Sequence, residues 1–204
     1  ETYFTHMVAG YLKEYPSGSP DLGNYGEYLP AYIEQFKPAE GLVYLSDVTR
    51  LEWCWHQAFN AQDESLLTDS MQASELKKTS ELQPLSSLEN VAEDSFSDIR
   101  FKVVSSAHLL SSEYPVHRIW QVNQDDYHGD QTVNLGEGAA KLIIWRSADY
   151  GMRVDELSED EYQFVGALLA SKPLAEIADM TFSQTFGEIL QRCIQTGLII
   201  GFRI

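Results

Sequence analysis

The chain has 204 residues, 44% of them hydrophobic and 12% aromatic, which is enough for one large domain or two small ones. It carries 14 Lys and Arg against 31 Asp and Glu, a formal net charge of −17. No apolar run approaches the roughly 20 residues of a membrane span, and no secretion signal is visible. Cys54 and Cys193 lie far apart in apolar helical patterns, which fits buried free thiols in a reducing cytoplasm.

Residues 1–61 show helical periodicity almost throughout. Apolar residues at spacings of three to four predict helices over residues 2–15 and 25–36, and Pro30 should kink or restart the second. A third helix over residues 42–61 is apolar over so much of its surface that it should pack on more than one side. Because the chain opens on Glu1 within a helical pattern, we expect this helical domain to continue upstream.

The composition changes between residues 62 and 98. This stretch holds ten Ser and Thr and nine Asp and Glu against two Lys, with few large apolar residues. It is typical of a linker containing a weak helix or two, and we expect the domain boundary here. The predicted domains are therefore residues 1–61, the linker 62–98, and residues 99–204.

Residues 99–204 combine strands with short helices. Alternating apolar residues predict a strand over 99–105, and Pro115 opens a short helix. The predicted elements that follow a polar loop are a hairpin of strands 141–146 and 151–157, three helices over 159–171, 173–178 and 182–196, and a closing strand over 198–204. Ser158 and Glu161 form a capping pair for the first helix, and Gly197 ends the third. The fold class is α+β, with a winged-helix-like domain at the C-terminus.

Winged helices usually bind DNA, but the charge of this chain argues against it. Residues 140–204 hold six Lys and Arg against nine Asp and Glu, and the preceding residues hold eight against twenty-two. Nucleic-acid binders need a basic face that displaces counterions from phosphate. Two hypotheses follow: a domain that holds a peptide, or a transcriptional regulator that binds DNA in spite of its charge.

A search for catalytic motifs finds none that persuades. The glycines of residues 136–140 precede a strand, whereas a dinucleotide loop follows one. The acidic cluster at residues 125–130 lacks the spacing of a calcium loop, and Glu52 with His56 lacks the second His of a metalloprotease helix. We therefore expect no enzyme activity, no catalytic residue, no metal site and no cofactor.

Four strings of residues, in the same order over nearly the whole chain, carry a family resemblance. They are SPDLGNYG at residues 19–26 followed by LP at 29–30, YLSDVTRLEW at 44–53, EYPVHRIW at 113–120, and IWR at 144–146. This pattern resembles the HvfC/BufC-type peptide-modification chaperones, a family first catalogued under a DNA-binding label.

The resemblance implies a non-catalytic partner of a multinuclear iron-dependent oxidase. Such an enzyme modifies cysteines of a small ribosomally made precursor peptide, and the chaperone is thought to present the precursor's leader segment. The C-terminal domain is similar to the leader-binding winged fold of PqqD. No catalytic residues are transferred by the resemblance.

An extended peptide can add to a sheet edge, where main-chain hydrogen bonds supply affinity. The hairpin 141–157 provides such an edge, and the helix 182–196 forms the opposite wall. The predicted peptide-binding residues are Met152, Arg153, Val154, Glu188, Gln191, Arg192 and Gln195. Arg192 is the residue expected to pair with an acidic residue of the leader.

Overall fold

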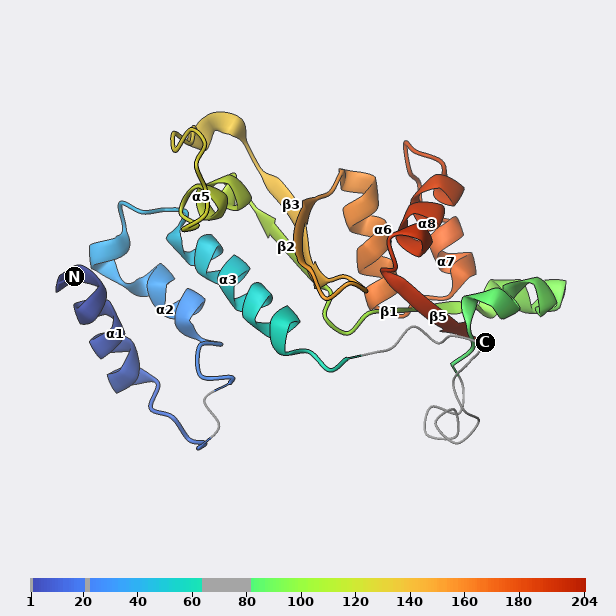
Figure 1. Cartoon of the computed structure of the whole chain (residues 1–204), viewed down its shortest axis with the longest axis horizontal. Coiled ribbons are helices and arrows are strands. Elements are labelled where there is room, and N and C mark those ends of the chain that lie inside the picture. The colour runs from blue at the N-terminus through green and yellow to red at the C-terminus, as the bar shows by residue number, and fades with distance from the viewer. Residues whose placement is uncertain (1, 21–22, 64–81) are drawn as a thin grey trace. The chain divides into compact units, whose positions relative to one another are not determined.

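The computed structural model describes residues 2–20, 23–63 and 82–204 (Figure 1). The chain folds into two compact units, of which the first comprises Glu1–His56 and Leu110–Ala140 and the second Gln57–Leu109 and Lys141–Ile204. Helices and antiparallel sheets are both present, which confirms the α+β class. No helix among the described residues is long and apolar enough to cross a lipid bilayer.

The first unit is helical. Its elements are α1 (Thr2–Glu14), α2 (Leu29–Gln35), a 3₁₀ turn (Lys37–Ala39), most of α3 (Leu45–Asn60), most of the strand β2 (His108–Ser112), α5 (Val116–Val122) and a second 3₁₀ turn (Leu135–Glu137). A small core forms where α1 and α2 meet, from Met7, Tyr11, Tyr32, Ile33 and Ala39. The predicted restart at Pro30 is confirmed, because α2 begins at Leu29 with this proline in its first turn.

Contacts with α3 bind residues 110–122 to the helical unit. The Ser112 hydroxyl donates to Asp47 Oδ2 at 2.6 Å, and the rings of Trp55 and Trp120 lie 4.8 Å apart between centroids. The compact units therefore differ from the predicted division into 1–61, 62–98 and 99–204. Periodicity along the chain does not show that a later segment returns to an earlier helix.

The second unit contains a two-stranded sheet whose strands lie far apart in sequence. β1 (Arg100–Val103) pairs antiparallel with β5 (Ile199–Arg203), and a bridge from Gln83 to Phe202 extends this pairing. Two 3₁₀ helices, Leu85–Asn90 and Glu93–Asp98, precede β1. Leu85, Leu88 and Val91 pack on the core of this unit, so this end of the predicted linker is folded onto it; residues 64–81 of that linker lie outside the described residues.

The second sheet has the order β2-β3-β4. The predicted hairpin is present as β3 (Ala140–Arg146) and β4 (Met152–Glu156), and β2 (His108–Ser112) is a strand that the sequence did not predict. β3 is buried on both faces, with Leu142 and Ile144 on one side and Ile143 and Trp145 on the other. β4 is an outer strand of this sheet.

Three helices follow the hairpin and lie together on one side of it (Figure 1). They are α6 (Glu159–Leu169), α7 (Leu174–Ala178) and α8 (Phe186–Gln195). Ser158 and Glu161 form the predicted capping box, and Gly197 takes a positive φ of 78° after α8, as a helix-ending glycine should. The predicted element order is present. Because β5 pairs with β1 and not with the hairpin, a winged-helix arrangement stays a prediction.

Candidate peptide-binding groove

A groove of about 500 Å³ lies within the second unit between β4 and α8. Residues from β3, β4, α6 and α8 and the segments beside them line it: Ile143, Trp145, Arg153, Asp155, Glu156, Leu157, Glu161, Val165, Ile189, Arg192, Cys193, Gln195, Thr196 and Leu198. Its volume falls within the range of typical ligand sites. It coincides with the place where the sequence predicts a bound peptide.

The floor of the groove is apolar and well packed. Ile143, Trp145, Val165, Ile189 and Leu198 are each at most 5% exposed and belong to the core of the unit. Alternation along β3 directs Ile143 and Trp145 toward the helices. The helical period directs Val165 on α6 and Ile189 on α8 toward the sheet. A side chain that enters the groove would therefore meet fixed apolar surface.

Strand register decides which residues of β4 face the groove. Trp145 lies opposite Arg153, and Ile143 lies opposite Asp155. Arg153 and Asp155 therefore project on the same face as the floor, whereas Met152 projects on the other face. The indole Nε1 of Trp145 donates to Asp155 Oδ2 at 2.9 Å, which fixes the position of this carboxylate.

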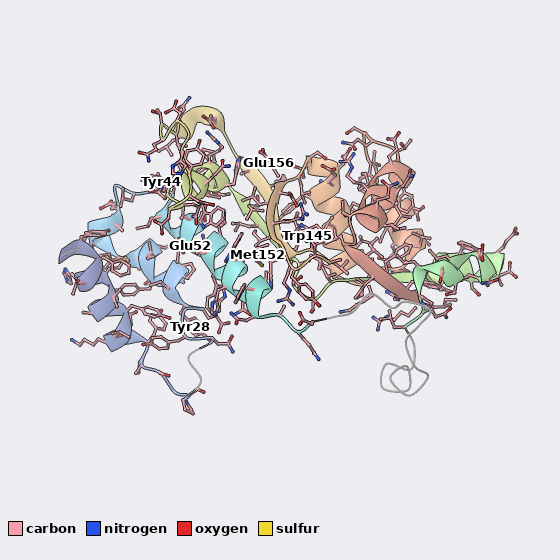
Figure 2. All side chains as sticks on the ribbon, viewed as in Figure 1. Tyr28, Tyr44, Glu52, Trp145, Met152 and Glu156 are labelled. Carbon is pink, nitrogen blue, oxygen red and sulfur yellow. The ribbon has the colours of Figure 1, made fainter. Side chains whose placement is uncertain are left out.

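The hydrogen-bond pattern of the hairpin decides which main-chain groups of β4 point away from β3. Ser147 N donates to Gly151 O at 2.9 Å, and Leu157 N donates to Lys141 O at 2.8 Å. Because bonded pairs alternate along an antiparallel ladder, the main-chain groups of Met152 and Val154 point away from β3. Figure 2 labels Trp145 on β3 and Met152 and Glu156 at the two ends of β4. Within the described residues, no further strand pairs with this edge.

The wall opposite β4 comes from α8 and the first turn of α6. Arg192, Gln195 and Thr196 line the groove from α8 and its C-cap. Arg192 forms an ion pair with Glu161 of α6, and Glu161 Oε2 accepts a hydrogen bond from Ser158 N at 2.8 Å. Arg192 is thus already bound to the capping box of α6. The amino-acid pattern of α8 predicts that Arg192 is exposed but does not show this ion pair.

Asp160 fixes the segment that leads into α8. Its Oδ2 accepts hydrogen bonds from the Ser183 hydroxyl at 2.5 Å, from Ser183 N at 2.8 Å and from Gln184 N at 2.9 Å. These bonds lower the pKa of Asp160 below its usual value of 3.8, and the bond from the Ser183 hydroxyl has the largest effect. The first turn of α6 therefore holds α8 through Arg192 and the segment before α8 through Asp160.

The predicted site residues divide into three groups. Arg153, Arg192 and Gln195 line the groove. Met152 and Val154 turn their side chains to the other face and offer only main-chain groups at the edge. Glu188 and Gln191 are exposed on α8 outside the lining set, because the groove faces a narrower arc of this helix than was predicted.

Sequence reasoning missed Asp155 and Glu161 as groove residues. Period-two alternation already places Asp155 on the same face as Arg153, so the sequence held a signal for it. Glu161 was assigned only its capping role. Its second role, as the partner of Arg192, depends on how α6 and α8 cross, and no local pattern encodes that.

The first unit contains a second hollow, of about 380 Å³, lined mostly by tyrosines and by the loop at residues 16–19. Tyr11 Oη donates to Tyr25 O at 2.5 Å, and Tyr25 Oη donates to Tyr15 O at 2.7 Å, so the rings are held in place. Tyr28, labelled in Figure 2, is 54% exposed at this hollow. The tyrosines thus serve mainly to join α1 to the segment before α2.

Other candidate chemistry is weak in the described part of the chain. No group of three or more His, Cys, Asp or Glu there is arranged to hold a metal ion. Burial raises the pKa of the Cys54 thiol to about 11 and that of the Cys193 thiol to about 12, so both are protonated at neutral pH. His56 Nε2 lies 2.8 Å from Gly23 O and stacks on Trp53, a structural role.

Comparison with known proteins does not assign a function to this groove. A scan of the chain against protein-family models finds no match, and a search of curated proteins finds no similar sequence. The functional argument therefore rests on the groove and on the sequence strings described above.

Proposed function

We propose that this protein is a non-catalytic adaptor that binds the leader segment of a ribosomally made precursor peptide in the groove between β4 and α8. The single observation that carries the proposal is an outward-facing strand edge beside a groove with an apolar floor. A peptide that adds to this edge gains main-chain hydrogen bonds from Met152 and Val154, and its side chains gain apolar contact with the floor.

We further propose a multinuclear iron-dependent oxidase as the partner and the cytoplasm as the location. Support comes from the resemblance to the HvfC/BufC-type chaperones, whose strings at residues 44–53 and 113–120 both lie in the first unit. The adaptor needs no metal or cofactor of its own, since the oxidase would supply the chemistry.

The alternative, a DNA-binding regulator, has less support. In the predicted winged helix α8 would be the recognition helix, but its exposed residues Glu188, Gln191, Arg192 and Gln195 include one positive and one negative charge. Arg192 is also paired with Glu161. With a net charge of −17, phosphate anchors are scarce. Tight, salt-sensitive binding to one duplex sequence would favour this alternative instead.

The substitution Val154→Pro tests strand addition. The Val154 N–H points away from β3, so proline removes a donor to the peptide without removing a bond of the hairpin ladder. Val154→Ala is the matched control, because it keeps the N–H. We expect titration calorimetry with the leader of a neighbouring precursor gene to show at least tenfold weaker binding for the proline variant alone. Equal affinity of both variants would exclude the β4 edge as the binding site.

A further inference from the structure

The groove has an internal charge polarity that comes from β4. Arg153 and Asp155 are two residues apart and project on the groove face. Arg153 lies 3.7 Å from Asp149, and the side chains of this pair are 49% and 71% exposed, so the contact is weak. Asp155 uses Oδ2 for the Trp145 indole, which leaves Oδ1 to a ligand.

The charges of the opposite wall neutralise one another. Arg192 pairs with Glu161, whose side chain is 12% exposed and whose second oxygen caps α6. A ligand that recruited Arg192 would have to break this pair. A peptide can therefore meet the charges of β4 while the Arg192–Glu161 pair stays intact. These charges are positive at Arg153 and negative at Asp155, next to Glu156 at the rim.

Strand pairing would place two peptide side chains directly against these charges. Since β4 uses Arg153 and Asp155 for bonds to β3, the peptide residues opposite them on the outer edge form non-hydrogen-bonded pairs. In an antiparallel arrangement such pairs have the closest side chains, with Cα atoms about 4.5 Å apart. Opposite charges in directly facing positions stabilise a strand pair, and like charges destabilise it.

We propose that the groove selects an extended segment with one acidic and one basic side chain two residues apart, the acidic one facing Arg153 and the basic one facing Asp155. This inference rests on the proposed function, because it assumes strand addition at β4. It replaces Arg192 by Arg153 as the residue that reads an acidic side chain. The order of the two charges also reports direction: an antiparallel peptide must present its basic residue first, and a parallel one its acidic residue first.

Three synthetic 12-residue peptides test the inference. They share a Val- and Thr-rich background and differ at the centre, which reads Lys-Val-Glu, Glu-Val-Lys or Gln-Val-Gln, so that all carry the same net charge. We expect fluorescence anisotropy to show that one charge order binds roughly threefold or more tighter than the other, with the neutral peptide between them.

The sharpest variant exchanges the two charges, Arg153→Asp with Asp155→Arg, and leaves the net charge unchanged. The preferred peptide order should reverse. Since the exchange removes the acceptor of the Trp145 indole, a thermal melt must accompany it. If the exchanged protein is unfolded, Arg153→Gln alone is used and should weaken the preference between the orders, which Asp155 alone would then maintain. Lys172→Gln, an exposed residue outside the groove, is its matched control and should keep the preference.

Each outcome of these experiments supports or overturns a specific part of the proposal. Equal binding of both orders, or a preference that survives the exchange, overturns the charge-reading proposal. If the orders bind equally but Val154→Pro still abolishes binding, strand addition stands and only the charge selectivity fails. If none of the three peptides binds, neither the selectivity nor strand addition at β4 holds.

Discussion

At the scale of single residues, the groove shows how one side chain can serve two neighbours. Glu161 accepts a hydrogen bond from Ser158 N and forms an ion pair with Arg192. The capping box that starts α6 thereby also orients α8. An exposed position on a helical pattern, such as Arg192, is consequently not a free probe of ligand binding.

Arg192→Glu should destabilise the fold. The substitution places a second carboxylate beside Glu161 and removes its partner, and we expect a loss of about 1 kcal/mol in the free energy of unfolding. Gln191→Glu, on the adjacent exposed position, should change it by less than about 0.5 kcal/mol. Urea denaturation of both variants measures the difference. Equal stability would mean that the Arg192–Glu161 pair contributes nothing to holding α8.

Asp160 should make the stability of α8 depend on pH. Its pKa is lowered by hydrogen bonds that only the folded state offers, so the carboxylate stabilises the fold above its usual pKa of 3.8. That contribution is lost as the pH falls through the lower, folded pKa.

We therefore expect Asp160→Asn to be less stable than the wild type at pH 7, with the difference shrinking toward pH 2–3. Chemical denaturation at several pH values checks this, with Asp179→Asn at the exposed end of α7 as the control. A constant difference across this range would contradict the role assigned to the Asp160 carboxylate.

At the scale of elements, single residues at the helix ends determine where the helices stop. α8 ends before Gly197, whose φ of 78° lies in the left-handed region that favours glycine. A side chain there would meet no neighbour within 4 Å, so the requirement for glycine is conformational and not steric crowding. α8 and β5 are thus joined by a turn that this one residue makes possible.

Gly197→Ala should cost about 1 kcal/mol of unfolding free energy, because alanine is strained at this φ. Gly187→Ala provides a matched comparison on the same helix. It also meets nothing within 4 Å, has ordinary helical φ, and should be about 0.5 kcal/mol more stable than the wild type. Thermal unfolding of the two variants should give shifts of opposite sign; shifts of the same sign would contradict the conformational argument.

At the scale of the whole molecule, the acidic charge concerns partners more than fold. A net charge of −17 favours solubility and disfavours nucleic acid, and it suits a protein partner with a basic or neutral surface. The proposed groove lies wholly in the second unit, so the first unit is the surface on which we expect the proposed oxidase partner.

Co-expression with an iron-dependent oxidase encoded nearby should yield one complex on size exclusion at micromolar concentration. Because we propose peptide binding for the second unit and oxidase binding for the first, Val154→Pro should leave this complex intact while it weakens peptide binding. Separate elution of the two wild-type proteins would count against the oxidase as partner. Loss of the complex in Val154→Pro alone would place the oxidase contact on β4 instead.

Local patterns predicted most elements of this fold. Periods of 3.6 and 2 located α1, α3, α6 and the hairpin to within a few residues, since amphipathic spacing reflects burial of one face. β2 was missed because residues 108–112 show no clean alternation: burial there follows from β3 beside it and not from its own sequence. For the groove, alternation was enough to place Arg153 and Asp155 on one face of β4.

The sequence by itself determined the α+β class, the hairpin followed by three helices, the capping box at Ser158 and the glycine stop at Gly197. These features depend on neighbours within a few residues. Only the tertiary structure decided that β5 pairs with β1 about a hundred residues away, that residues 110–140 join the helical unit, and that Arg192 is held by Glu161. Such contacts depend on long-range packing, which leaves no periodic mark on either of the segments that meet.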